Sequence, residues 1–360
     1  MSLTGVRSRT MSYKIPLSIL YLGRRGGGAK ITKQISDDLQ NSTKFSTAAI
    51  CIRRDNELEK EYDQSNAITI FDDLISAKTL FKLCKYALNP KKLLTDMRLT
   101  NTGTCIVPMI SPLGLMVECI LKGQGVTVIH LLHDFKKHPG EVWPPNVLIR
   151  RIVRQSEFLI VLSSDVAEKV KNLNPKVLLS MYPHPVFNFS PSKSGASDSR
   201  NYILFIGRIR KYKGVDNLIE AYLNLKIENI DLVIAGQGIL RVKKDPRIKV
   251  INRWLEESEI ASLIKLSEVV VFPYIEASQS GILPYCVYEN KKIVVTPLKG
   301  LLEQTRTYNN IFVAKNLEVI SLRNALEVAI VTEANLTSVN SHTTKNIEAC
   351  LLESGLFTKK

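Results

Sequence analysis

The sequence predicts an α/β protein with two domains, each built on a doubly wound parallel sheet. Three observations support this fold class. Short apolar runs alternate with stretches of helical spacing along nearly the whole chain, which is the pattern of parallel strands joined by crossover helices. The chain has 360 residues, 45% hydrophobic and 23% charged, which is enough for two ordinary globular cores. A segment rich in Pro, Ser and Gly divides the chain near its middle.

The expected domain boundaries follow from that segment. We predict a loose tail at residues 1–12, a first domain at 13–185, a linker at 186–200, a second domain at 201–340, and a closing helix within 341–360 that can cross back to the first domain. The start of the chain lacks the apolar core of a secretory signal. The longest apolar region, residues 104–121, contains two prolines and a glutamate, so no transmembrane helix is predicted.

The first domain is expected to open with a strand that leads into a glycine-rich turn. Strands are predicted at 15–22, 48–51, 67–70, 126–135, 158–163 and 177–180, and helices at 29–39, 74–88, 113–122 and 146–155. The first strand is followed by Gly26, Gly27 and Gly28, which let a backbone approach a ligand at a helix start. A tight strand-to-helix turn explains the same glycines, and both interpretations stay open.

His133 and Asp134 end a buried strand of this domain. Ligands of open α/β sheets bind outside the carboxyl ends of the strands, which is where these two side chains are expected. A histidine there can act as acid, base or hydrogen-bond donor, and an adjacent aspartate can orient it. His130 lies within the strand and is interpreted instead as a packed core histidine.

The second domain begins with a strand, a cationic turn and a helix. Its strands are predicted at 202–206, 230–235, 249–251, 269–272 and 292–296, and its helices from Gly214, at 256–266, from near Gly281 and at 319–331, with the closing helix at 345–352. The first turn carries Gly207, Arg208, Arg210, Lys211 and Lys213. Backbone N–H groups, a helix dipole and cations meet there, so a phosphate is the natural guest. A solvated basic turn is the alternative.

A second phosphate candidate lies at the helix expected near Gly281. Ser278, Ser280, Gly281 and Ile282 would present hydroxyl and N–H groups there. Ordinary capping of the helix by serine is the alternative interpretation.

These turns resemble a known family. Gly207-Arg208, Lys213-Gly214-Val215-Asp216 and Leu218-Ile219-Glu220-Ala221 are similar to the signature of the group 1 (family 4) glycosyltransferases of bacterial polysaccharide biosynthesis. The resemblance continues through residues 234–238 and 270–281. It covers the second half of the chain well and the first half only in patches. It implies the GT-B fold, in which two Rossmann-like domains face each other, and retaining transfer of a hexose from a nucleotide-diphosphate donor.

The resemblance also implies site residues. The expected catalytic residues are His133, Asp134, Arg208 and Lys213, with the two cations stabilising the leaving diphosphate without a metal ion. The expected donor-binding residues are Gly27, Gly28, Gly207, Gly236, Gly238, Arg253, Ser278, Ser280, Gly281, Ile282 and Glu303. No cofactor is expected beyond the nucleotide sugar itself. No metal site is expected either, because no Asp-x-Asp motif stands in a suitable loop and the six cysteines lack metal-ligand spacing.

The chain departs from the family at one motif. Family members usually carry Glu-x7-Glu around the second phosphate turn, and alignment on Gly281 puts Ser278 and Cys286 at those positions. Glu276 and Glu289 lie nearby and could partly substitute. A subset of the family resembles this chain more closely, with an Ala-Ser-Gln-Ser-Gly turn and no first glutamate. A non-catalytic sugar-nucleotide-binding protein on the same fold is the alternative function.

The formal net charge of +15 requires an acidic partner or surface. Nucleic acid is not expected, because the cations are scattered and are not interleaved with aromatic residues. An anionic membrane surface is favoured, since several basic clusters fall in the first half: Lys82 with Lys85, Lys91-Lys92, Lys136-Lys137, and Arg150-Arg151 with Arg154. The alternative interpretation of the helix at 146–155 is a core-packing helix whose basic face is simply solvated. We expect a cytoplasmic enzyme, peripheral at the inner face of the membrane, acting on a lipid-linked, oligosaccharide or polysaccharide acceptor.

Overall fold

A computed structural model describes most of the chain. The described residues are 14–57, 59–62, 65–74, 76–139, 143–187, 189, 201–227, 229–240, 245–334 and 345–357. The tail predicted at residues 1–12 and most of the linker predicted at 186–200 lie outside them.

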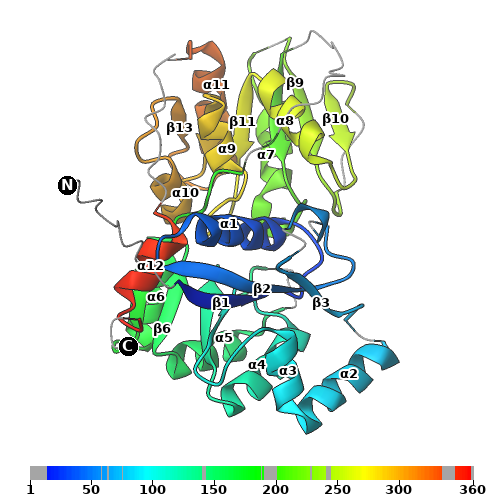
Figure 1. Ribbon diagram of the computed structural model, residues 1–360. Coiled ribbons are helices and arrows are strands. Elements are labelled where there is room, and N and C mark those ends of the chain that lie inside the picture. Colours follow the sequence, from blue (N-terminus) through cyan, green and yellow to red (C-terminus); the bar gives the residue numbers. More distant parts are fainter. Residues whose placement is uncertain are drawn as a thin grey trace, which may run out of the picture.

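The first domain is built on a seven-stranded sheet in which every pairing is parallel (Figure 1). The strand order is β3-β2-β1-β4-β5-β6-β7. The bounds are β1 Ile15–Leu20, β2 Phe45–Arg53, β3 Ala67–Phe71, β4 Thr104–Val107, β5 Thr127–Leu132, β6 Phe158–Val161 and β7 Leu178–Met181. We did not predict β4, although all four of its residues are buried between β1 and β5.

Helices cover both faces of this sheet (Figure 1). Their bounds are α1 Gly27–Asn41, α2 Ala77–Leu88, α3 Pro90–Asp96, α4 Pro112–Gly123, α5 Asn146–Gln155 and α6 Ser164–Leu173. Ile31 and Ile35 of α1 join one core with Ile19, on the side that faces the second domain. Helices α2 to α4 cover the opposite face in a separate core, and α5 packs with α6 in a third.

The second domain repeats this architecture with six parallel strands in the order β10-β9-β8-β11-β12-β13. The strands are β8 Tyr202–Ile206, β9 Asp231–Ala235, β10 Ile248–Ile251, β11 Val269–Phe272, β12 Lys292–Val295 and β13 Ile311–Val313. The helices are α7 Val215–Leu223, α8 Glu257–Leu266, α9 Leu283–Tyr288, α10 Lys299–Gln304 and α11 Val319–Val331. In each sheet the strand order reverses at one point, between β1 and β4 and between β8 and β11, which is where ligands of such sheets bind. The predicted fold class of two doubly wound parallel domains is confirmed.

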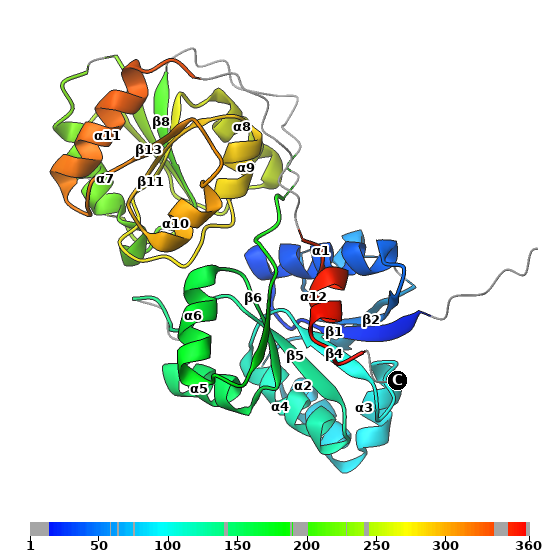
Figure 2. The same ribbon diagram turned by 90° about the vertical axis from the view of Figure 1, so that its left-hand side faces the viewer.

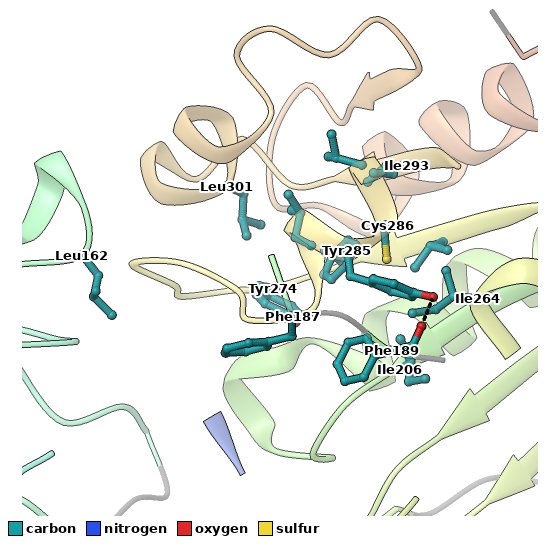
Figure 3. Close-up of a cluster of buried hydrophobic side chains, with 14 of the residues drawn as sticks. Leu162, Phe187, Phe189, Ile206, Ile264, Tyr274, Tyr285, Cys286, Ile293 and Leu301 are labelled. Carbon is teal, nitrogen blue, oxygen red and sulfur yellow. Dashed lines mark hydrogen bonds between the residues drawn. The ribbon is translucent and has the colours of Figure 1, made fainter. Parts of the chain in front are cut away.

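Two aromatic residues of the predicted linker belong to the core of the second domain. Phe187 and Phe189 are buried, and the ring of Phe189 meets the ring of Tyr285 edge-on with centroids 4.7 Å apart. The hydroxyl of Tyr285 donates a hydrogen bond of 3.2 Å to the carbonyl of Phe189, as Figure 3 shows. The chain is therefore anchored on the second domain before β8 begins, because these aromatic rings have apolar surface to bury.

The helix after the second domain lies on the first domain (Figure 2). This helix, α12 Ile347–Glu353, packs against α1 and β7. The backbone N–H of Ile347 donates to Asp38 of α1 over 3.0 Å, and Phe357 meets Phe45 edge-on at 4.9 Å. The chain thus contributes elements from both of its ends to the first domain.

Within the described part of the chain, none of the helices has both the length and the apolar character that crossing a bilayer requires.

Candidate active site

The cationic turn after β8 packs closely against the end of β11. Gly214 joins the short 3-10 turn Lys211–Lys213 to α7 with a φ of 66°, and a Cβ added there would overlap the carbonyl oxygen of Pro273. Only glycine fits this left-handed backbone at so close an approach. The turn is thereby held beside the loop that follows β11.

Lys213 connects the two predicted phosphate turns. Its ammonium group lies 3.6 Å from the centroid of the buried Tyr274 ring, and the hydroxyl of Tyr274 is 3.1 Å from that of Ser280. Arg208 lies on the same turn with an exposed side chain. The structure therefore brings Lys213 and the turn at Ser278–Gly281 together, as the phosphate interpretation requires.

The serines of the second turn do not cap a helix. Helix α9 begins at Leu283, its N-cap is Ile282, and no side chain caps it. The backbone of Ser280 is held by Gln304 instead, through hydrogen bonds of 2.7 and 3.0 Å. The N-capping interpretation of Ser278 and Ser280 is therefore wrong, because both hydroxyls are engaged elsewhere.

Ser278 meets the predicted catalytic pair of the first domain. Its hydroxyl donates to the carboxylate of Asp134 and lies 3.2 Å from the carbonyl oxygen of His133. Both residues come directly after the carboxyl end of β5, as predicted. His133 Nε2 is 2.8 Å from the carbonyl oxygen of Pro108, so that nitrogen carries a proton. Burial lowers the pKa of His133 below its ordinary value, against the opposing effects of Asp134 and the Pro108 carbonyl, so the ring is neutral at pH 7.

The sequence reasoning missed His138, which bonds carboxylates of both domains. Its Nε2 is 3.1 Å from Asp134 and its Nδ1 is 3.2 Å from Glu276, while its ring stacks on Tyr212 with centroids 4.4 Å apart. Burial lowers the pKa of His138, but hydrogen bonds and charges from Asp134 and Glu276 outweigh burial and hold the pKa above its ordinary value. Glu276 also pairs with Lys136 at 3.2 Å. The spacing of four residues between Asp134 and His138 was the sequence feature that could have indicated this contact.

His138 in turn affects Asp134. Burial raises the pKa of Asp134, but hydrogen bonds from His138 and Ser278 prevail and lower it overall. Asp134 is therefore an ionised carboxylate at neutral pH, placed where the two domains meet.

The end of the predicted first domain supplies a second histidine that sequence reasoning passed over. A Cβ at Gly281 would lie 3.1 Å from Nε2 of His184, so the imidazole lies directly against the second phosphate turn. Burial lowers the pKa of His184 to about 4, and this histidine is neutral at pH 7. The signal was its place between two prolines next to the predicted domain boundary.

The glycine-rich turn of the first domain also reaches the second domain. Gly27 begins α1, and the N–H of Gly26 donates to Glu57 over 2.6 Å. Gly28 packs on Tyr21 and Met109, and a Cβ there would lie 2.9 Å from the Tyr21 ring and 2.8 Å from the end of the Met109 side chain. The neighbouring cations reach across the domain boundary: the Arg25 guanidinium lies 4.5 Å from the centroid of the Trp254 ring, and Lys30 pairs with Glu257 at 2.7 Å.

Two predicted donor-binding glycines have a clear packing role. A Cβ at Gly236 would overlap the carbonyl oxygen of Gly207, and one at Gly238 would overlap that of Ile209. The turns after β8 and β9 therefore lie backbone to backbone. This packing accounts for Gly236 and Gly238 whether or not a donor approaches them.

Two charged residues predicted to bind the donor have protein partners. Arg253 forms a bidentate ion pair with Glu259 at 2.8 and 2.5 Å, at the surface of its own domain. Glu303 of α10 accepts hydrogen bonds from the backbone N–H of Ser164 at 2.9 Å and from its hydroxyl at 2.7 Å, at the start of α6 in the first domain. Lys299 and Glu168 add a second contact between the same helices at 2.5 Å.

Cys286 cannot stand in for the missing second glutamate. Its side chain is fully buried in the cluster that Figure 3 shows, and burial raises the pKa of the thiol well above its ordinary range. Glu289 follows α9 as its C-cap. Of the two acidic residues near this turn, Glu276 is the one that contacts the first domain.

Comparison with known proteins relates the chain to one family. Residues 186–330 match the family described as glycosyl transferases group 1. Over 172 residues the chain is 24% identical to a GDP-mannose:glycolipid 4-beta-D-mannosyltransferase of Xanthomonas campestris pv. campestris, a match that covers 45% of this chain and 48% of that protein. The match thus spans about half the length of this curated relative.

Solved structures resemble the whole chain. Anabaena HepE in complex with UDP-glucose superimposes with a TM-score of 0.67 at 13% identity, covering 95% of both chains. Sucrose-phosphate synthase from Thermosynechococcus elongatus gives a TM-score of 0.65 at 13% identity, covering 87% of this chain and 89% of that one. At these identities the likeness shows the fold. The second domain thus matches the group 1 glycosyltransferase family, and the whole chain has the two-domain GT-B architecture.

Proposed function

We propose that this protein transfers a hexose from a nucleotide-diphosphate donor to a lipid-linked or polysaccharide acceptor. One observation carries the proposal: Lys213 and the turn at Ser278–Gly281 lie together in the second domain, and Ser278 bonds Asp134 of the first. The diphosphate site that we propose and an ionised carboxylate would thus lie on either side of the domain boundary.

The donor chemistry follows from the cations. As the sugar leaves, negative charge grows on the diphosphate, and preorganised donors that meet this charge lower the barrier. We propose that Arg208 and Lys213 are these donors, each through charge-assisted hydrogen bonds that contribute about 1.5–3 kcal/mol. We propose that they do so without a metal ion or any cofactor other than the donor itself.

The acceptor is proposed from the relative and from charge. The Xanthomonas enzyme is described as acting on a glycolipid, and the net charge of +15 suits an anionic membrane surface. We therefore place the protein in the cytoplasm, peripheral at the inner face of the membrane, with a lipid-linked acceptor approaching His133 and Asp134.

Two stereochemical outcomes compete. Retention is what the family resemblance implies. Inversion is the alternative: with an α-linked donor sugar, the beta linkage in the relative's name corresponds to inversion, and Asp134 would then remove the proton of the acceptor hydroxyl. The one-bond coupling constant between C1 and H1 of the transferred sugar, read by NMR of the product, separates the two for any hexose.

A thermal-shift screen against UDP, GDP, ADP, CMP and their sugar nucleotides tests donor binding. A ligand at about a hundred times its dissociation constant stabilises the folded state by about 2.7 kcal/mol, a few degrees for domains of this size. We expect one nucleotide to raise the melting temperature, and Arg208→Ala and Lys213→Ala to abolish the shift. Lys211→Ala, which removes an exposed cation from the same turn, is the matched control and should keep it.

Two results would count against the proposal. If no nucleotide produces a shift, the second domain does not bind a nucleotide donor. If one binds without turnover across a broad panel of acceptors, the chain is the non-catalytic sugar-nucleotide-binding protein that the loss of both family glutamates also allows.

A further inference from the structure

Helix α2 carries a second apolar face, and this face is exposed. Its inner side buries Thr79, Leu83 and Tyr86 against the first domain. On the outer side, Leu80 and Phe81 are 50% and 64% exposed. Leu88, about two turns further along the helix, is 87% exposed. These spacings place the three side chains on one side of the helix.

Lysines border this outer face along one side. Lys78, Lys82 and Lys85 follow one another at intervals of four and three residues, and the ammonium group of Lys85 lies 4.5 Å from the centroid of the Phe81 ring. The surrounding segment, residues 74–95, contains five lysines and no aspartate or glutamate. Lys92 pairs with Asp96 over 2.7 Å. Exposed apolar side chains bordered by lysines such as Lys78, Lys82 and Lys85 are typical of a helix that lies in a membrane interface.

We propose that the outer face of α2, defined by Leu80, Phe81, Leu88 and the lysines beside them, binds an anionic lipid bilayer. The apolar side chains enter the interface, and the lysines reach phosphate groups with their long stems extended. A second copy of the chain fits this face poorly, because a symmetric contact would bring the two rows of lysines together. The proposal deepens the proposed function, on which its purpose rests: a lipid-linked acceptor has to be met at a membrane surface.

The position of α2 suits that purpose. The helix starts a few residues after the carboxyl end of β3, and Asp134 follows the carboxyl end of β5 in the same parallel sheet. Parallel strands end at one edge, so the start of α2 and the candidate active site share that edge of the first domain.

Helix α5 has the other notable basic surface, but it lacks the apolar part. Arg150, Arg151 and Arg154 are exposed, and Val147 is its one large apolar side chain that is strongly exposed. Such a surface attracts anionic lipid from a distance without inserting. We therefore assign insertion to α2 and only general attraction to α5.

Cys84 allows a direct test, because it is exposed on the outer side of α2. In a Cys119→Ser background, which removes the other exposed cysteine, an environment-sensitive fluorophore is attached to Cys84 of the full chain. Phosphatidylcholine vesicles containing about one-third phosphatidylglycerol should shift its emission to the blue, and pure phosphatidylcholine vesicles should not. The same fluorophore at Val331→Cys, in a Cys84→Ser/Cys119→Ser background, should show no shift.

Vesicle co-sedimentation of unlabelled variants then measures the contribution of each part. At low salt, Lys78→Gln/Lys82→Gln/Lys85→Gln should weaken binding by about a hundredfold, since each cation near such a surface contributes about a factor of five. Leu80→Ser/Phe81→Ser/Leu88→Ser, which leaves the charge unchanged, should weaken binding by a hundredfold or more. The matched apolar control is Leu266→Ser/Val328→Ser/Val331→Ser in the second domain, and the matched charge control is Arg150→Gln/Arg151→Gln/Arg154→Gln; we expect less than a tenfold effect from each.

The proposal is overturned if the α2 variants bind vesicles as tightly as the controls do. It is also overturned if light scattering shows that the Leu80→Ser/Phe81→Ser/Leu88→Ser variant converts a dimer to a monomer, since a second copy would then cover this face. Neither assay contains donor or acceptor. Failure of membrane binding therefore leaves the nucleotide thermal shift intact, and failure of the proposed activity leaves vesicle binding intact.

Discussion

His138 bonds one carboxylate in each domain, which makes its protonation part of the contact between them. The groups that face it are Asp134 and Glu276, the Tyr212 ring beneath it, and Lys136, which shares Glu276. Since both ring nitrogens lie near carboxylate oxygens, the doubly protonated ring satisfies the arrangement best. Its pKa is raised in the folded protein, so this contact is strongest below the ordinary histidine pKa and is lost as the pH rises through the folded value.

We predict that His138→Gln removes a pH-dependent part of the stability. Near pH 6, the variant should melt about 2–4 °C below the native protein, which corresponds to roughly 1.5 kcal/mol for hydrogen bonds to charged groups. As the pH rises past the folded pKa of His138, the two melting temperatures should converge. Melting curves from about pH 5.5 to about pH 9 check this, and a constant difference at every pH would contradict it.

At the residue scale, the sequence indicated several candidate site residues but not the residues that contact them. Asp134 and Lys213 were predicted because strand ends and cationic turns have local signatures. The roles of His138 and Glu276 depend on a contact between residues 138 positions apart, which no local pattern shows. Ser278 was expected to cap a helix or bind phosphate, and it donates to Asp134 because the two loops meet.

Among the elements, α6 and α10 form a direct connection between the domains. Glu303 of α10 accepts both hydrogen bonds that Ser164 offers at the start of α6, where an acidic group also complements the helix dipole. Glu303 was predicted to bind the donor, and α6 was not predicted as a helix. Only two of its residues, Val166 and Val170, are buried, which leaves a weak periodic signal.

Ser164→Ala and Glu303→Gln separate the two roles of Glu303. We expect each variant to weaken the contact between α6 and α10, with a coupling energy of about 1–2 kcal/mol in a double-mutant cycle of thermal unfolding. If Glu303 also binds the donor, Glu303→Gln should lower nucleotide affinity about tenfold more than Ser164→Ala does. Equal affinities in calorimetric titrations of the two variants would limit Glu303 to its contact with α6.

For the whole molecule, the strand and helix alternation was sufficient to predict two doubly wound domains. The arrangement of those domains was beyond the sequence, because it depends on single contacts such as Lys30 with Glu257 and Lys299 with Glu168. The same reason explains why the burial of Phe187 and Phe189 could not be predicted from the sequence. The proline- and serine-rich segment was predicted only as a linker, yet its two aromatic residues belong to the core of the second domain.

We predict that substitutions in α12 destabilise the first domain. Leu351 is fully buried, so Leu351→Ala should cost about 2–5 kcal/mol in the free energy of unfolding. The loss should appear as faster hydrogen exchange in α1, with the strands of the second domain unchanged. Val331→Ala, at a side chain that is 73% exposed, is the control and should change neither domain. Faster exchange confined to the second domain would contradict the prediction.

The position of α12 also sets an order of events during synthesis. The ribosome completes every strand of the first domain, and then the entire second domain, before α12 emerges. Until that moment the surface of α1 and β7 that α12 covers is exposed to solvent. Asp38 and Thr43 then lack their hydrogen-bond partners in α12, which lie more than three hundred residues downstream. The domain that is translated first is therefore the one that finishes folding last.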